Sequence, residues 1–216
     1  ATLIDKPLMQ NVLADLEIEV EAATLMITRL SGAHERMEVD EREQAFARLA
    51  TPVAKYWLTK QSNPVVREAL ECVGGNGYVE DSMMPRLYRE APLNAIWEGA
   101  GNVIALDIGR AASRNPESVE IFLEELEQSR GRDAGIDEHL DALRAEFANP
   151  LSEAEARRLV EKLAITWAAT LMVEYGHPSV SEAYLMSRVG GDHGSLFGTL
   201  PTSCDLDEIS RRAVPA

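Results

Sequence analysis

Glu98 lies in a short segment whose residue types could support proton transfer: Ile96-Trp97-Glu98-Gly99-Ala100-Gly101-Asn102. A carboxylate beside a large aromatic ring, and partly removed from water, becomes a better proton acceptor because burial disfavours its charged form. The glycines after Glu98 predict a non-helical stretch that ends before the next helix. An exposed loop glutamate is the ordinary explanation, and residue types alone favour it.

A second candidate is the glycine cluster Gly74-Gly75-Asn76-Gly77, which is followed by Tyr78. Three glycines in four positions let a backbone approach a ligand closely. A helix C-cap followed by a turn explains the same residues, and it is the better explanation of the cluster taken alone. The cluster does not follow a strand and open a helix, so it predicts no Rossmann dinucleotide site. Arg89-Glu90 lies between this cluster and Glu98.

Amphipathic helices must position these residues. Apolar residues at steps of three and four predict a helix over 7–30, with Ser31-Gly32 as its stop. A longer helix is expected over 41–73, bent or interrupted at Pro52 and Pro64 and ended by Gly74-Gly75. The chain should then form a loop over 74–82, a turn or two of helix at 85–88, a break at Pro92 and a helix over 103–112.

The second half also predicts helices. Asn115-Pro116-Glu117 is a strong helix start, and that helix should end near Gly131. Further helices are expected over 137–147, from a capping box of Ser152 and Glu155 to Tyr175, and over 180–189, before an irregular glycine-rich tail. Sustained alternation typical of strands is almost absent. The sequence therefore predicts an all-α fold in two helical sections, residues 1–114 and 115–216.

Three linked elements resemble the C-terminal helical domain of the acyl-CoA dehydrogenase family, most closely its AidB-like (alkylation-response) branch. They are Gly74-Gly75-Asn76-Gly77-Tyr78, Arg89-Glu90 and Trp97-Glu98-Gly99, in the family's order and at matching separations. The resemblance covers about residues 8–112 and implies a four-helix bundle. An additional helical section, as in AidB-like proteins, would then occupy residues 115–216.

The resemblance implies roles for two of these elements, the Glu98 segment and the glycine loop. Glu98 would be the catalytic base that removes the α-proton of an acyl-CoA thioester while a hydride leaves for FAD. Contacts with FAD would come from the segment around Glu98 and from the glycine loop of a neighbouring subunit: Ile96, Trp97, Gly99, Ala100, Gly101, Asn102, Gly74, Gly75 and Gly77. That arrangement implies a homo-oligomer, a tetramer in the family.

Two features of the segment set expectations for activity. Trp97, Ala100 and Asn102 stand where many family dehydrogenases carry tyrosine, threonine and glutamine, and a bulky Trp97 would narrow an acyl pocket. The family's flavin lies mainly on domains that precede this bundle. We therefore interpret the chain as a C-terminal fragment that is inactive alone.

Charge and composition narrow the alternatives. The net charge is −15, with −5 in residues 1–114 and −10 in residues 115–216, which argues against DNA binding by the AidB-like additional section. Cys72 and Cys204 are predicted to be reduced thiols of a cytoplasmic protein. No metal site, membrane-spanning run or secretory signal is predicted. Three classes stay open: an acyl-CoA-oxidising flavoenzyme, a DNA-associated stress flavoprotein, and a fragment that only builds an oligomer interface.

Overall fold

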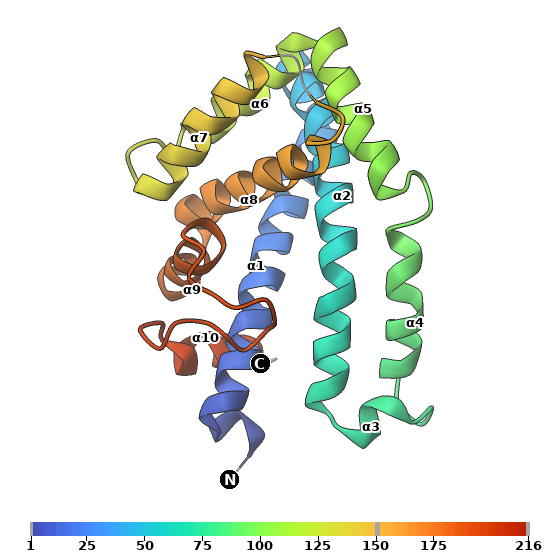
Figure 1. The fold of residues 1–216 in the computed structure, drawn as a ribbon, viewed down its shortest axis with the longest axis vertical. Helices are drawn as coiled ribbons and strands as arrows, with labels where there is room; N and C mark the ends of the chain where they lie inside the picture. The colour runs from blue at the N-terminus through green and yellow to red at the C-terminus, as the bar shows by residue number, and fades with distance from the viewer. Residues whose placement is uncertain (1, 150–151, 215–216) are drawn as a thin grey trace.

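A computed structural model describes residues 2–149 and 152–214, and within them every regular element is helical (Figure 1). This confirms the predicted all-α fold. The elements are a 3-10 turn (Leu3–Asp5), α1 (Pro7–Arg36), α2 (Glu41–Cys72), α3 (Gly75–Tyr78), α4 (Met84–Asn94), α5 (Gly101–Arg114), α6 (Pro116–Glu127), α7 (Ala134–Phe147), α8 (Ala156–Tyr175), α9 (Pro178–Tyr184), a π-helical turn (Leu185–Val189) and α10 (Leu206–Arg212).

The two longest helices, α1 and α2, pack against each other and form the centre of the fold. The predicted stop at Ser31-Gly32 is wrong, because α1 continues to Arg36. A glycine inside a helix costs only about 1 kcal/mol, and the neighbouring buried residues Leu30 and Ala33 keep this turn packed. α2 also continues without interruption past Pro52 and Pro64, and Asp40 caps its start by accepting from the amides of Arg42 and Glu43.

The glycine cluster and the Glu98 segment are joined by α4, which packs along α2. Two expectations fail here. The predicted loop over 74–82 contains the single helical turn α3, and α4 runs through Pro92, which lies in its last turn. α5 begins at Gly101, two residues earlier than predicted, so only the segment between Asn94 and Gly101 is non-helical.

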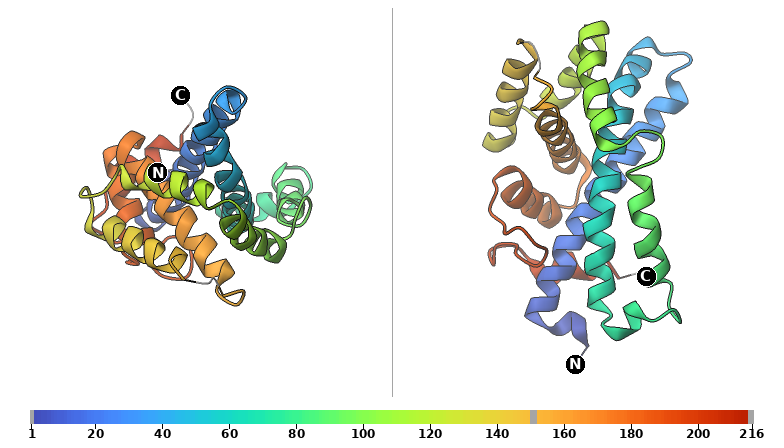
Figure 2. Two further views of the ribbon diagram at one scale, coloured as in Figure 1. Left: turned by 90° about the horizontal axis from the view of Figure 1, so that it is seen from above. Right: turned by 45° about the vertical axis from the view of Figure 1, so that its right-hand side comes forward.

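The second section, α6 to α10, covers one side of α1 and α2, whereas α4 lies on the other side (Figure 2). The start predicted at Pro116 is confirmed, whereas α7 begins at Ala134, α8 at Ala156 and α9 at Pro178, a few residues away from the predicted starts. The predicted caps also differ. Asn115 makes no capping hydrogen bond and instead accepts from Arg48, and the Ser152–Glu155 capping box does not form. The tail predicted to be irregular contains a further short helix, α10, which packs against α1.

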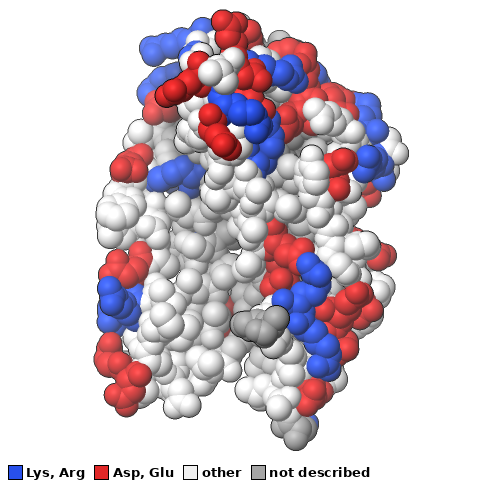
Figure 3. Space-filling view, turned by 180° about the vertical axis from the view of Figure 1, so that it is seen from behind, with Lys and Arg blue, Asp and Glu red and all other residues white. Residues whose placement is uncertain are grey.

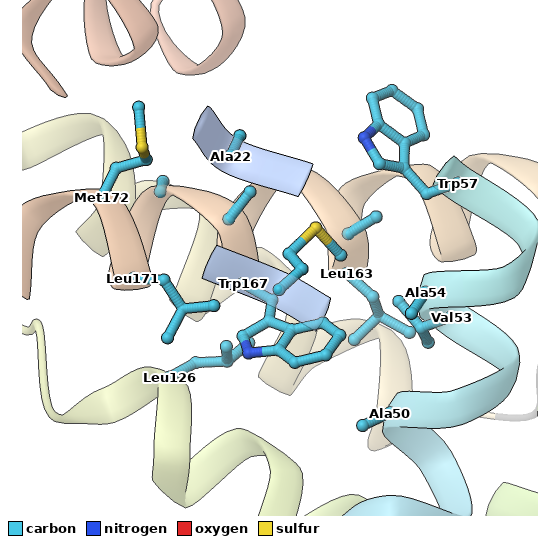
Figure 4. Close-up of a cluster of buried hydrophobic side chains, with 14 of the residues drawn as sticks. Ala22, Ala50, Val53, Ala54, Trp57, Leu126, Leu163, Trp167, Leu171 and Met172 are labelled. Atoms are coloured by element: carbon cyan, nitrogen blue, oxygen red, sulfur yellow. The ribbon is translucent and has the colours of Figure 1, made fainter. Parts of the chain in front are cut away.

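Both sections contribute to one cluster of buried side chains. Trp167 of α8 is fully buried, and α1, α2 and α6 contribute Ala22, Ala50 and Leu126 to the same cluster (Figure 4). The rings of Phe46 and Phe122 each lie edge-on to the Trp167 ring, with centroids 5.6 and 5.5 Å away. The two predicted sections thus share a core through α8.

The segment after α9 is also fastened to α1. Arg188, in the π-helical turn, donates to Asp15 at 2.6 Å and to Glu19 at 2.7 Å, and all three side chains are buried or nearly so. Asp15 also accepts from the amide of Gly198, and Asn11 exchanges two hydrogen bonds with the backbone of Leu200. These contacts hold the segment around residues 198–200 against the first helix.

Candidate active site

Glu98 lies in the segment that connects α4 to α5, and its side chain is exposed. Its φ is 53°, and it is the one residue other than glycine with positive φ in the described part of the chain. This conformation costs an L-residue roughly 1–2 kcal/mol. Such strain persists only where the surroundings impose it, and it concentrates at functional sites.

The neighbours of Glu98 are exposed as well. Trp97 is 55% exposed and Ile96 is 62% exposed, so two large apolar side chains stand beside the carboxylate. Gly99 follows with φ 111°, and a Cβ there would meet Cγ1 of Ile104 at 3.2 Å. The segment therefore presents an apolar surface and a carboxylate together.

α2 supplies the ties that hold this segment. The ammonium of Lys55 donates to the carbonyl oxygens of Trp97 at 2.9 Å and Gly99 at 2.6 Å. From α8, Arg157 donates to the side-chain oxygen of Asn102 at 2.8 Å. Neither Lys55 nor Arg157 could be predicted from the sequence, because each lies 42 or more positions from its partner and no local pattern links it to the segment.

The glycine cluster forms the turn at the end of α2. Gly74 has φ 61°, which favours glycine, and Gly77 is buried so tightly that a Cβ would lie 2.3 Å from the Leu70 carbonyl oxygen. Gly74 and Gly75 face open space. Together with Tyr78, Tyr88 and others they line a concave region of about 870 Å³.

Arg89, from the second element of the motif, borders the same concave region. It forms an exposed ion pair with Glu80 at 2.7 Å, and this hydrogen bond lowers the pKa of Glu80. The pair links α4 to the turn after α3, and so it helps to shape one wall beside the glycines.

The Glu98 segment and the glycine cluster lie at opposite ends of α4 (Figure 1). An 11-residue helix separates them, which corresponds to about 16 Å. One chain therefore does not gather all the predicted cofactor contacts at one point. Residues 96–102 form one group, and Gly74, Gly75 and Gly77 form another.

A large apolar surface surrounds these segments. Of eighteen large hydrophobic side chains that are exposed, fifteen lie in residues 2–114, on α1, α3, α4 and the adjoining segments. From behind, a broad white area in the lower half of the molecule lies between groups of charged side chains at its two sides, whereas charges of both signs crowd its upper end (Figure 3). We refer to the exposed hydrophobic residues of 2–114 as the apolar face.

The arginines of the second section are mostly paired with carboxylates. Six of its eight arginines form ion pairs, namely Arg130, Arg132, Arg144, Arg188, Arg211 and Arg212. Within residues 2–149 and 152–214, no group of three or more histidine, cysteine and carboxylate side chains could hold a metal ion. No helix in those ranges is long and apolar enough to cross a membrane.

Comparison with known proteins places this arrangement in a family. The family model described as "Acyl-CoA dehydrogenase, C-terminal domain" matches residues 1–113. AidB of Escherichia coli (strain K12) is 35% identical over 182 residues, which are 84% of this chain and 33% of AidB. Acyl-CoA dehydrogenase family member 11 of Caenorhabditis elegans is 37% identical over 62% of this chain and 22% of its own length.

Two solved structures of other proteins have a similar fold. The apo form of Bd2924 has a TM-score of 0.70 at 28% identity, over 80% of this chain and 34% of that one. Caenorhabditis elegans ACDH-11, solved in complex with C11-CoA, has a TM-score of 0.65 at 25% identity, over 96% of this chain and 35% of that one. The chain thus spans about a third or less of these relatives. It belongs to the acyl-CoA dehydrogenase family, with similarity to AidB that continues past the family's C-terminal helical domain.

Proposed function

We propose that this chain is the C-terminal part of an FAD-dependent acyl-CoA dehydrogenase-type oxidoreductase in which Glu98 is the catalytic base. The observation that carries the proposal is the conformation of Glu98, strained and exposed within the aromatic-Glu-Gly segment that the family shares. Strain at an exposed carboxylate has no benefit for folding, so it is consistent with a chemical role.

The proposed reaction begins with the thioester placed beside Trp97 and Ile96, whose exposed apolar side chains would cover an acyl chain. Glu98 would accept the proton from the α-carbon, and the electron pair of the broken C–H bond would form the new double bond as a hydride leaves the β-carbon. FAD, when bound, supplies the acceptor for that hydride. Glu98 would then release its proton after the enoyl product leaves.

The described residues fit one side of a flavin site. The residues after Glu98 are Gly99, Ala100, Gly101 and Asn102, and Arg157 fixes the side chain of Asn102. At the other end of α4, Gly74 and Gly75 leave open space beside a concave region, and Tyr78 and Tyr88 offer aromatic surfaces there. Backbone without side chains suits close approach of a cofactor.

We further propose that the full-length protein is a homo-oligomer, a tetramer by resemblance. The two groups of candidate contacts are separated by α4, which is consistent with glycine loops that serve a neighbouring subunit's flavin. The apolar face also exposes fifteen large hydrophobic side chains, and exposed apolar surface, where it is contiguous, marks an interaction site. Association of copies and packing of the preceding domains would both cover it.

The test uses the full-length protein loaded with FAD. Mixing with saturated acyl-CoA thioesters of several chain lengths should bleach the flavin absorbance. The Glu98→Gln variant should retain FAD and lose bleaching by at least a hundredfold, because an amide cannot accept the α-proton. The matched control is Glu38→Gln, an exposed carboxylate outside the three elements, which should bleach as the unaltered protein does.

The result that would overturn the proposal is a flavin-loaded protein that no acyl-CoA bleaches. Association with DNA is the second candidate that the AidB resemblance raises. Retention on DNA that falls steeply with salt would support it. The charge of −10 over residues 115–216 and the pairing of six arginines weigh against it.

A further inference from the structure

The backbone conformation of Glu98 needs a cause. A residue with a side chain favours negative φ, yet Glu98 has φ 53° and the following Gly99 has φ 111°. The segment is short, because α4 ends at Asn94 and α5 begins at Gly101. Local hydrogen bonds hold only its first part, where the amides of Ile96 and Trp97 both donate to the Leu93 carbonyl.

Lys55 holds the second part of the segment. Its ammonium reaches the carbonyl oxygen before Glu98, at Trp97, and the carbonyl oxygen after it, at Gly99. Both distances, 2.9 and 2.6 Å, are those of charge-assisted hydrogen bonds. One side chain therefore fixes the Trp97–Glu98 peptide and the Gly99–Ala100 peptide, and these two anchors restrict the backbone of Glu98 and Gly99 between them.

The same contacts leave the carboxylate of Glu98 free. Among the described residues, no cation lies within the 4.0 Å of an ion pair to Glu98, even though Lys55 is tied to both of its neighbours. An ammonium has three donors and no acceptor, and here two donors are directed to carbonyl oxygens. The lysine thus holds the backbone without pairing with the acid.

Lys60 shows that this contact is specific. It lies five positions further along α2, and its ammonium is also near this region, 5.2 Å from the ring centroid of Tyr56. In the part of the chain that the structure describes, Lys60 forms no hydrogen bond to the segment around Glu98. The experiment uses this difference between two lysines of one helix, of which Lys55 alone donates to the Trp97 and Gly99 carbonyls.

We propose that Lys55 is a positioning residue, which clamps the carbonyl oxygens of Trp97 and Gly99 and so holds Glu98 in its left-handed conformation, with the carboxylate exposed and available to substrate. This inference rests on the proposed function of Glu98 for its catalytic meaning. The clamp itself is a claim about the backbone, and it can be tested without any turnover.

The first measurement is amide hydrogen exchange in the full-length protein. In Lys55→Met, the amides of Ile96 and Trp97 should exchange at least tenfold faster, because the segment loses its anchor on α2. Lys55→Arg should restore most of the protection, since a guanidinium can also donate to two carbonyls. Lys60→Met, the matched control, should stay within twofold of the unaltered protein. Unchanged exchange in Lys55→Met would overturn the clamp.

The second measurement is flavin bleaching by acyl-CoA. Lys55→Met should slow bleaching at saturating thioester at least tenfold while the half-saturating concentration changes less than threefold, with recovery in Lys55→Arg. Equal bleaching rates in Lys55→Met and the unaltered protein would overturn the positioning role. If Glu98→Gln still bleaches, the proposed function fails, and the exchange measurement still decides whether Lys55 holds the backbone.

A third comparison isolates residue 98. Glycine adopts positive φ freely, so Lys55→Met should lower the melting temperature by less than half as much in a Glu98→Gly background as in the unaltered protein. Equal losses in both backgrounds would overturn the idea that Lys55 acts on the backbone at residue 98. If Lys55→Met does not fold, Lys55→Gln, which retains a donor for one carbonyl, replaces it in all three measurements.

Discussion

Residues 2–114 and 115–214 are built from similar helices but have different surfaces. Among residues 2–149 and 152–214, the first section carries fifteen exposed large hydrophobic side chains, whereas the second carries three, Tyr175, Leu196 and Val214. Arginine–carboxylate pairs cover much of the second section, and its buried side chains pack onto α1 and α2. The second section thus buries its apolar side chains against the first, while the first retains exposed apolar surface.

The first section holds its carboxylates in two opposite ways. Asp15 and Glu19 are buried, and Arg188 of the second section forms an ion pair with each of them. Glu98 is exposed, has strained backbone and is anchored only through its neighbours' carbonyls. A buried paired acid contributes to the fold, and an exposed unpaired acid is available for chemistry.

The largest expected effect is a loss of stability when the buried ion pairs of Arg188 are broken. Arg188→Met should lower the free energy of unfolding by about 3–5 kcal/mol, because it leaves Asp15 and Glu19 buried without a counter-charge. Urea unfolding of the two proteins measures the difference. The control is Arg212→Met, whose partner Glu21 and own side chain are more exposed, and the expected loss is below about 1 kcal/mol. Similar losses in both variants would contradict the comparison.

A substitution on the apolar face should change the free energy of unfolding only slightly but should clearly weaken assembly. Met83 is 69% exposed, so Met83→Ser should change the free energy of unfolding by no more than about 0.5 kcal/mol. If the apolar face is covered in the full-length protein, the same change should weaken association, which sedimentation velocity measures. Leu196→Ser, at the same 69% exposure in the second section, is the control and should leave association unchanged. If Met83→Ser and Leu196→Ser weaken association equally, the two surfaces do not differ in their role in assembly.

The smallest expected effect is on the pH dependence of stability. Burial, foremost, and the nearby Lys162 lower the pKa of His139, which lies on α7 beside Thr166 of α8. Because an unfolded histidine has a pKa of about 6.5, the unfolded chain binds the proton first as the pH falls below that value. Stability should therefore be complete above about pH 6.5 and decline below it. His139→Gln should flatten this part of the profile in thermal melts between pH 7.5 and 5, and an unchanged decline would contradict it.

Sequence patterns predicted the helices well where amphipathic spacing extends over many turns, as in α2 and α8. They failed where packing overrides a local signal. Gly32 and Pro92 are breakers by residue type, yet one lies inside a long packed helix and the other in a last turn. The helix α10 was missed because seven residues after Asp205 offer too few turns to show a period.

The candidate site likewise contains residues that the sequence predicted and contacts that it did not predict. The motif located Glu98, Trp97 and Gly99, because its residue types and spacings are continuous in the chain. The contacts of Lys55 and Arg157 could not be predicted, since they arise only when α2 and α8 pack beside the segment. Which residue fixes a strained backbone is a tertiary property, and no local spacing encodes it.

The attachment of the late segment to α1 has a consequence for synthesis on the ribosome. Asp15 and Asn11 emerge first, but their partners Arg188 and Leu200 are 173 and 189 positions downstream. Until those residues emerge, α1 carries carboxylates whose counter-charge has not yet been made. Contacts of such long sequence separation slow folding, because the chain must close a long loop first. We therefore expect the first helix of this chain to reach its final surroundings among the last.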